Sequence, residues 1–409
     1  MHMYLNMTLP GLESFRVIEA REEKGFFHIH IERPRDWTPC PACQTLTQKV
    51  HDYRWQKIKH NRLFNRPTLI WYRKRRYQCH HRTCRKRFDE PNQLVDRYQR
   101  HSIEFNQALG LETIHGKTFK DTAQRFGVSP TTVMRRFDEI SEPLLTTTQQ
   151  LPSIIAIDDF KGDMDGERFQ TIVTDPIKRE PIDILKDRQK TTVYNYLKDH
   201  ADTVKVVVMD MSPSYKAAVD QALNQPIIVA DRFHFVRYIY WALDRVRRRV
   251  QNVFDDYDRK KCKRMRHVFM KQADMLSAKQ AWYLHHYCDK SDLLTDAYLL
   301  KEWFNDWFDN AKKQGPNALN AIKQGMYQFY DTVRASEIPE FEKAIETLQN
   351  WQKEIMNSFA YNLHNGYVEG INNQTKVIKR QAFGFRRFDR MRRKVLLHHK
   401  YKEIQGQMA

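Results

Sequence analysis

A series of strand-like and helix-like segments between positions 153 and 233 constrains the fold of this 409-residue chain more than any other feature. The apolar run "VKVVVMDM" (204–211) predicts a strand that is buried on both faces of a sheet. The turn-forming "DMDG" (163–166) predicts that the strands on either side of it pair antiparallel. The complete series consists of strands at 153–160, 168–175, 181–187, 204–211 and 226–233, with helices at 191–200, after Ser212 and from His234.

This order, βββαβαβα, is that of a ribonuclease-H-like fold, in which the first and fourth strands are neighbours. The first of these strands ends in Asp158 and Asp159, and the fourth ends in Asp210. Carboxylates at neighbouring strand ends repel one another unless a cation joins them, and Mg²⁺ (or Mn²⁺) prefers oxygen ligands. Adjacent strand residues point to opposite faces, so we expect only one of Asp158 and Asp159 to be a ligand, and alternation does not decide which. The alternative for each aspartate is a simple turn former.

A third acid stands at the head of a basic helix in "GYVEGINNQTKVIKRQAFGFRRF" (366–388). Steps of three or four residues from Glu369 place Asn372, Asn373, Lys376 and Arg380 on roughly one helical face. We expect Glu369 to join the two aspartates around metal ions that clamp the attacking and leaving oxygens of a phosphodiester. The basic residues behind it are expected to follow the DNA backbone: Lys376, Lys379, Arg380, Arg386 and Arg387.

The first hundred residues contain two close cysteine pairs, "CPAC" and "CHHRTC". Two such pairs can give four thiolates to one tetrahedral zinc ion: Cys40, Cys43, Cys79 and Cys84. The segment between the pairs has the alternation of strands, which predicts a zinc ribbon with a β-hairpin insert. The two histidines of "CHHRTC" lie close enough to compete as the fourth ligand. The zinc would be structural, with folding coupled to metal binding.

The segment "TFKDTAQRFGVSPTTVMRRFDEI" (118–140) predicts a helix-turn-helix. Gly127 can end the first helix in the left-handed conformation, Ser129 can cap the second helix, and Pro130 suits its first position. The second helix could lie in a major groove, whereas the alternative is an ordinary helical hairpin. We expect four residues to face outward toward DNA: Thr131, Thr132, Arg135 and Arg136.

The balance of charge agrees with a nucleic-acid partner. The chain has 69 Lys and Arg against 50 Asp and Glu, a net charge of +19, which is typical of a polyanion binder. No apolar run approaches the ~20 residues that cross a bilayer, and the N-terminus lacks the pattern of a secretion signal. We therefore expect a cytoplasmic protein that binds double-stranded DNA. The basic stretches Arg245–Arg249 and Lys260–Arg266 are expected to line that DNA.

These motifs together resemble the DDE transposases of bacterial insertion sequences of the ISL-three family. The resemblance covers nearly the whole chain and includes "IAIDDF", "VVVMDMSPSYKAAV", "ADRFHFVRYIYWALDRVRR" and "NGYVEGINNQTKVIKRQAFGFRRFDRMRRKVLL". It implies that Asp158, Asp210 and Glu369 correspond to the catalytic triad, although Asp159 stands where the family pattern "IDEF" has Glu. "DRFH" resembles a D-x-x-H signature, which implies that His234 touches the scissile phosphate or the leaving oxygen. The alternative for His234 is a residue that only packs at a helix N-terminus.

The sequence thus predicts a bacterial, nucleoid-associated DNA transposase that binds terminal inverted repeats, cuts and joins DNA with metal ions, and acts as a homodimer on DNA. Two alternatives remain: a non-enzymatic zinc-finger and helix-turn-helix regulator, and a ribonuclease-H-like nuclease without strand transfer. The expected architecture is multidomain α+β and α/β. Its parts are a zinc-binding β-rich domain (1–95), a helix-turn-helix domain (96–150), a ribonuclease-H-like core in two pieces (151–240 and 358–409), and an all-α insertion (241–357).

Overall fold

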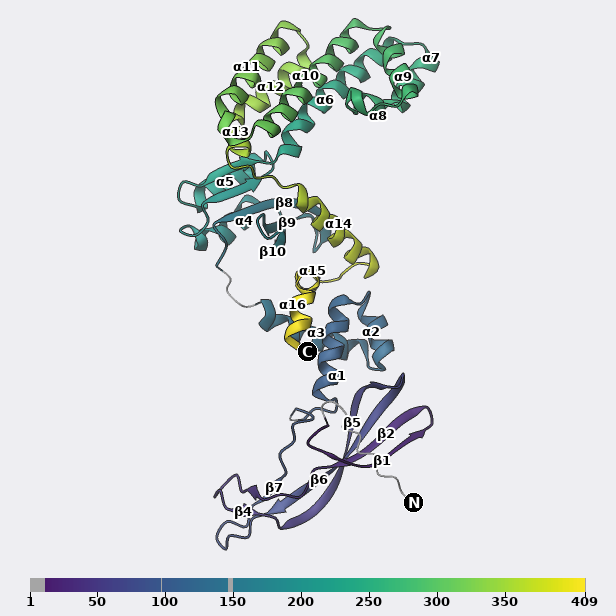
Figure 1. The fold of residues 1–409 in the computed structure, drawn as a ribbon, viewed down its shortest axis with the longest axis vertical. Coiled ribbons are helices and arrows are strands. Elements are labelled where there is room, and N and C mark those ends of the chain that lie inside the picture. The colour runs from purple at the N-terminus through teal and green to yellow at the C-terminus, as the bar shows by residue number, and fades with distance from the viewer. Residues whose placement is uncertain (1–11, 97, 146–149, 409) are drawn as a thin grey trace. The chain divides into compact units, whose positions relative to one another are not determined.

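The computed structural model describes residues 12–96, 98–145 and 150–408 (Figure 1). They form two compact units: Met1–Thr146 with Lys400–Ala409, and Thr147–His399. The first eleven residues and positions 146–149, where the chain passes from one unit to the other, lie outside the described ranges. Within those ranges, no helix is long and apolar enough to cross a membrane.

The first unit contains a five-stranded sheet of order β1-β2-β6-β5, with β7 paired to β6. The long antiparallel hairpin of β5 and β6 confirms the predicted insert between the cysteine pairs. Alternate residues of these strands point to opposite faces, so one face buries Ile29, Ile58, Ile70 and Tyr72. The strands are β1 (Arg16–Glu23), β2 (Phe26–Glu32), β3 (Thr38–Pro39), β4 (Leu46–Thr47), β5 (Val50–Leu63), β6 (Arg66–Gln78) and β7 (Arg87–Asp89).

Four helices complete this unit: α1 (Ile103–His115), α2 (Phe119–Phe126), α3 (Pro130–Leu145) and α16 (Tyr401–Met408). The predicted helix-turn-helix corresponds to α2 and α3. Gly127 ends α2 with a left-handed φ of 61°, a conformation that glycine adopts at low cost. Ser129 accepts a hydrogen bond from the backbone N–H of Thr132 at 3.1 Å, which confirms its predicted capping role.

The second unit is built on a mixed sheet of order β10-β9-β8-β11-β12. Strands β8 (Ile154–Met164), β9 (Glu167–Asp175) and β10 (Glu180–Leu185) are antiparallel neighbours. Strand β11 (Val206–Met209) is fully buried and runs parallel to both β8 and β12 (Ile227–Ala230), as its apolar sequence predicts. Strand β8 is longer than expected, because the turn needs only Asp165 and Gly166, whose positive φ angles suit a two-residue hairpin.

Helices surround this sheet and continue into an α-helical bundle (Figure 1). Helices α4 (Lys190–Leu197) and α5 (Pro213–Ala222) follow the strands in the predicted order, and α14 (Gly366–Gln381) lies beside β8. Helix α15 (Phe388–His399) packs against β10. Short 3₁₀ helices occur at Lys198–His200, Gln251–Val253, Ala273–Met275 and Pro316–Ala318.

The region between the sheet and α14 is helical, as predicted. Helix α6 runs without a break from the edge of the sheet into the bundle, so the expected boundary at 241 lies inside it. Trp307 and Trp351 are buried in the core that the bundle shares with the sheet. The helices are α6 (Arg232–Val250), α7 (Asp256–Arg264), α8 (Arg266–Phe269), α9 (Ala278–Cys288), α10 (Asp292–Gln314), α11 (Leu319–Ala335), α12 (Pro339–Asn350) and α13 (Gln352–Ala360).

The prediction that the stretch Arg245–Arg249 of α6 lines DNA is wrong for one of its residues. Arg247 is only 2 % exposed, and its guanidinium donates to the buried carboxylate of Asp244. Arg248 and Arg266 also form ion pairs with Asp244. Arg247 and Arg248 thus neutralise a carboxylate of their own helix, and Arg266 joins α8 to it, because a buried carboxylate requires charged partners.

Candidate active site and metal centre

Three aspartates lie side by side where the parallel pairing of β8, β11 and β12 ends. The register pairs Met209 of β11 with both Ile157 of β8 and Ala230 of β12. Neighbouring strands lie roughly 4.8 Å apart, so residues at the same level of this sheet are close in space. The residue that follows each paired position is an aspartate: Asp158, Asp210 and Asp231.

Asp158 is fixed by two hydrogen bonds. Its Oδ1 accepts from the backbone N–H of Asp159 at 2.8 Å, and its Oδ2 accepts from the side-chain amide of Asn372 at 3.0 Å. Burial raises the pKa of Asp158 to about 6. The backbone hydrogen bond and the charge of His234 oppose this shift, whereas the carboxylates of Asp210 and Asp159 add to it. Asp158 therefore lies near Asp210, which follows β11, and contacts helix α14.

Asp159 has a different partner. Its Oδ2 lies 3.0 Å from Nη1 of Arg188, which forms an ion pair with it. The two adjacent acids are thus separated as strand alternation requires: one contacts α14, and the other is neutralised by a cation of this chain. Arg188 was not identified from the sequence, because nothing in the pattern of the segment after β10 distinguishes it from a solvated charge.

Asp210 carries a buried oxygen without a partner. Among the described residues, nothing forms a hydrogen bond with its Oδ1. Burial raises the pKa of Asp210, the positive charge of His234 opposes the shift, and the Asp159 carboxylate adds to it. An unsatisfied buried carboxylate is costly in free energy, and a hard divalent cation would satisfy it. The donor set at these strand ends therefore fits such a cation.

His234 lies beside this acidic group in the first turn of α6. Its Nδ1 is 3.1 Å from Oδ2 of Asp231, whose Oδ1 accepts from the backbone N–H of Asn365. Burial lowers the pKa of His234, but the hydrogen bond and charge of Asp231 outweigh burial, so the pKa is raised overall. Because Asp231 is only 4 % exposed, it holds the imidazole in one orientation.

Glu369 lies in the first turn of α14 and is exposed. The next turn of the same helix carries Asn372, which contacts Asp158. Among the described residues, only the cysteine cluster brings three or more potential ligand atoms within 4.8 Å of one another. The structure therefore brings the helix of Glu369 to Asp158, but does not draw the three carboxylates of Asp158, Asp210 and Glu369 that close together.

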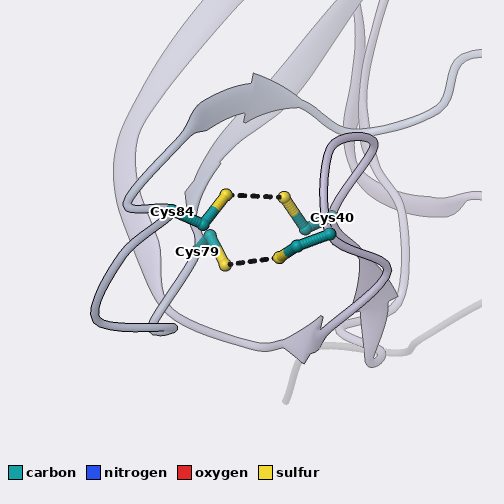
Figure 2. A group of neighbouring side chains, drawn as sticks. Cys40, Cys79 and Cys84 are labelled. Atoms are coloured by element: carbon teal, nitrogen blue, oxygen red, sulfur yellow. Dashed lines mark hydrogen bonds between the residues drawn. The ribbon is translucent and has the colours of Figure 1, made fainter.

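The four predicted zinc ligands meet in the first unit (Figure 2). The Sγ atoms of Cys40 and Cys84 are 3.6 Å apart, and those of Cys43 and Cys79 are 3.5 Å apart. Tetrahedral zinc with Zn–S bonds of about 2.3 Å requires sulfur atoms at similar separations. Hydrogen bonds with Thr45 lower the pKa of Cys43 to about 6, which favours a thiolate ligand. The cluster consists of cysteines, so the histidines of "CHHRTC" are not needed as ligands.

Comparison with known proteins matches three regions of the chain to family models. A family model described as a transposase matches residues 155–395. A model of the helix-turn-helix domain of transposase family ISL3 matches residues 90–141, and a model of the zinc-finger of transposases IS204/IS1001/IS1096/IS1165 matches residues 37–84. The chain belongs to the ISL3 transposase family. It is thus a DNA-binding, nucleic-acid-cleaving insertion-sequence transposase with a structural zinc site, and the predicted family and fold class are confirmed.

One relative that matches along nearly its full length supports the same assignment. The transposase for insertion sequence element IS1001 of Bordetella parapertussis is 26 % identical over 410 residues, which is 93 % of this chain and 94 % of the relative. An ATP-dependent protease of Lactococcus lactis subsp. lactis is 31 % identical over 84 residues, 20 % of this chain and 27 % of the relative. The Drosophila P element transposase strand transfer complex matches 76 % of this chain and 94 % of its own with 12 % identity and a TM-score of 0.37, too low to support an argument.

The helix-turn-helix of this transposase presents only part of the expected outward face. Thr131 and Arg135 are exposed, and Thr132 is half-buried. Arg136 was expected to face outward, which is wrong: it is 9 % exposed and its guanidinium donates to Glu139 and to Gln99. It lies one helical turn after Val133 and next to Phe137, so it belongs to the inner face of α3.

The basic end of α14 and the start of α15 lie in the transposase's second unit. Lys376, Arg380, Arg386 and Arg387 are exposed. Lys379 is half-buried, and its ammonium group donates to the backbone carbonyl of Gly162. Lys379 thus also joins α14 to strand β8.

Proposed function

We propose that this transposase cuts and joins DNA with divalent cations held by Asp158, Asp210 and Glu369. The observation that carries the proposal is the register of β8, β11 and β12, which places an aspartate directly after the last parallel pair on each of the three strands, one of them with an unpartnered buried oxygen. When bound there, Mg²⁺ (or Mn²⁺) would activate the attacking oxygen and stabilise the leaving oxygen of the phosphodiester. Glu369 would complete the ligand set from the first turn of α14.

The other residues of the site prepare it for a phosphate. Asn372 orients Asp158 through the 3.0 Å hydrogen bond. His234 is held by Asp231 and has a raised pKa, so it can donate a hydrogen bond to the scissile phosphate or to the leaving oxygen. The ion pair with Arg188 keeps Asp159 out of the ligand set. Most of the rate acceleration would come from positioning and charge neutralisation.

Each of the two units would contact a different part of the DNA. We propose that the zinc and helix-turn-helix modules bind the terminal inverted repeats, with Thr131, Thr132 and Arg135 at the DNA. The basic residues of α14 and α15 would follow the backbone near the cut: Lys376, Lys379, Arg380, Arg386 and Arg387. Two transposon ends must be paired, so the active form on DNA would be a homodimer, working at the bacterial nucleoid. The five-part division of the chain proposed from the sequence is kept for this scheme with two changes: α6 spans the boundary at 241, and α16 belongs to the first unit.

A joint cleavage and strand-transfer assay tests this function. The full chain is incubated with a duplex that carries the end of its element, with Mg²⁺ or with excess chelator. We expect strand cleavage at the end and, with pre-cut ends, covalent joining to target DNA, both only when the divalent cation is present. Cleavage without joining would identify a nuclease. Binding without either reaction would identify a regulator.

Replacing Asn372 with alanine tests how Asp158 is positioned. We expect cleavage at limiting Mg²⁺ to fall by roughly 10- to 100-fold, the usual cost of losing a residue that orients a metal ligand. The loss should shrink as Mg²⁺ is raised, because the ligand itself remains. The matched control is Gln374→Ala, an exposed neighbour in the same helix, which should cleave with the wild-type dependence on Mg²⁺. Equal effects of both substitutions would contradict the positioning role.

Two adjacent arginines of α3 should respond differently to alanine. Arg135→Ala should weaken binding to the transposon end by roughly 5- to 150-fold, the range for a lost base contact, without lowering Tm. Arg136→Ala should lower the Tm of the first unit by roughly 2–4 °C per kcal/mol of stability lost, because its guanidinium is buried. Fluorescence anisotropy and thermal unfolding measure the two effects. The reverse pattern would show that α3 is turned the other way toward DNA.

A further inference from the structure

A cleft of about 670 Å³ lies at the C-terminal end of α14. Its lining contains four cations and no acidic side chain: Lys161, Asn373, Lys376, Val377, Lys379, Arg380, Phe383 and Gly384. Among the described residues, the carboxylate that forms ion pairs with these cations is that of Asp163, which is 3.7 Å from the ammonium of Lys161 and 3.9 Å from that of Lys379. One carboxylate does not neutralise four cations, so the cleft favours an anionic ligand.

Phe383 is the unusual member of this lining. Its side chain is 93 % exposed, the largest exposed fraction of any large apolar residue that the structure describes. Its φ is +55°, a conformation that bulky residues adopt only at a cost. The backbone holds it there: the N–H of Phe383 donates to Arg380 and that of Gly384 donates to Lys379, both at 3.0 Å. Left-handed residues often end helices, but an exposed aromatic ring in this conformation is unusual, and such strained residues cluster at ligand sites.

The combination of cations and an aromatic ring identifies the ligand chemistry. Single-stranded nucleic acid is bound in this way, with phosphates on Lys and Arg and bases stacked on aromatic rings. A ring cannot stack on a base inside an intact duplex, where both faces of the base are covered. A second copy of this chain would meet the same four like charges, which disfavours a contact between copies.

We propose that Phe383 stacks on an unpaired nucleobase of the DNA strand whose phosphates lie against Lys161, Lys376, Lys379 and Arg380. The proposal rests on the proposed function, because it assumes that DNA follows α14 away from the active site. Fourteen residues separate Glu369 from Phe383, and at 1.5 Å per residue this is roughly 21 Å along the helix. At 3.4 Å per nucleotide the unpaired base lies about six positions from the cut phosphodiester.

A mismatch scan tests the contact. Full-length protein is bound, in chelator to prevent cutting, to end duplexes that carry a single mismatch at each of ten successive positions beside the cut. A mismatch removes part of the unpairing cost, so binding should tighten when it lies about six positions from the cut. Phe383→Ala should weaken binding to that duplex by roughly 5- to 150-fold, and Phe383→Tyr should restore it. The Tm of Phe383→Ala should be unchanged, because the side chain is exposed.

Lys376→Ala is the matched control in the same cleft. It should weaken binding to matched and mismatched duplexes alike, and should reduce the salt dependence of binding. If Lys376→Ala weakens binding but Phe383→Ala does not, stacking is refuted while the DNA path along α14 stands. If neither substitution weakens binding, the DNA path itself is refuted. If Phe383→Ala changes the mass of the DNA-free protein in light scattering, Phe383 belongs to a contact between copies and the proposal is overturned.

Discussion

Replacing Asp210 with asparagine should reduce DNA cleavage by on the order of 10³-fold while leaving binding to the transposon end unchanged. A catalytic cation contributes several kcal/mol of transition-state stabilisation, and ~4 kcal/mol corresponds to that factor. Asparagine keeps the size of the side chain but lacks the charge that would hold the cation at the unpartnered oxygen. Single-turnover cleavage measures the rate, and fluorescence anisotropy measures binding.

The neighbouring acids supply the controls for this result. Asp158→Asn and Glu369→Gln should cause losses of similar size, because removing any one ligand disables the same cation site. Asp159→Asn should cost much less, since Arg188 already neutralises that carboxylate. A Glu369→Gln variant that cleaves at the wild-type rate would remove Glu369 from the site. Equal losses for Asp158→Asn and Asp159→Asn would show that strand alternation does not separate their roles.

The sheet and its acids were predictable because each strand, and the aspartate that follows its apolar run, is recognised from a short stretch of sequence. The apolar run of β11 can only be a central strand, and parallel strands align their carboxyl ends. An aspartate directly after each run therefore indicates one edge of the sheet. The length of β8 was not predictable in the same way. Its last residues owe their pairing with β9 to the left-handed turn at Asp165 and Gly166 rather than to apolar alternation.

The contacts that orient the site could not be predicted because they join distant positions. Asn372 is 214 residues from Asp158, and only the fold brings its amide to that carboxylate. Arg188 looks in the sequence like a solvated charge, yet it pairs with Asp159. For Arg136 the prediction failed in the other direction: it was expected to face DNA and is buried. Helical spacing allows either face for a residue at the border of the apolar stripe, and packing against Gln99 and Glu139 decides for the interior.

Removing zinc should unfold the cysteine-bearing end of the first unit without affecting the fold of the second. A structural zinc site contributes about 10–16 kcal/mol of apparent binding free energy, and this energy is also folding energy. Apart from zinc, the loops that carry the cysteines are held by the short strands β3, β4 and β7 and by a few backbone hydrogen bonds. We expect one zinc ion per chain by elemental analysis. Chelation should abolish specific end binding, measured by anisotropy, and lower the first thermal transition.

Cys79→Ser should reproduce the effect of chelation, because serine is a poor zinc ligand and Cys79 lies inside the cluster. The matched control is Cys288→Ser, a half-buried cysteine of α9 outside the cluster, which should keep one zinc ion and normal end binding. The second unit has its own core, so its thermal transition should be the same in both variants. If Cys79→Ser retained zinc at wild-type affinity, a histidine of "CHHRTC" would have to complete the coordination, and the four-cysteine assignment would be wrong.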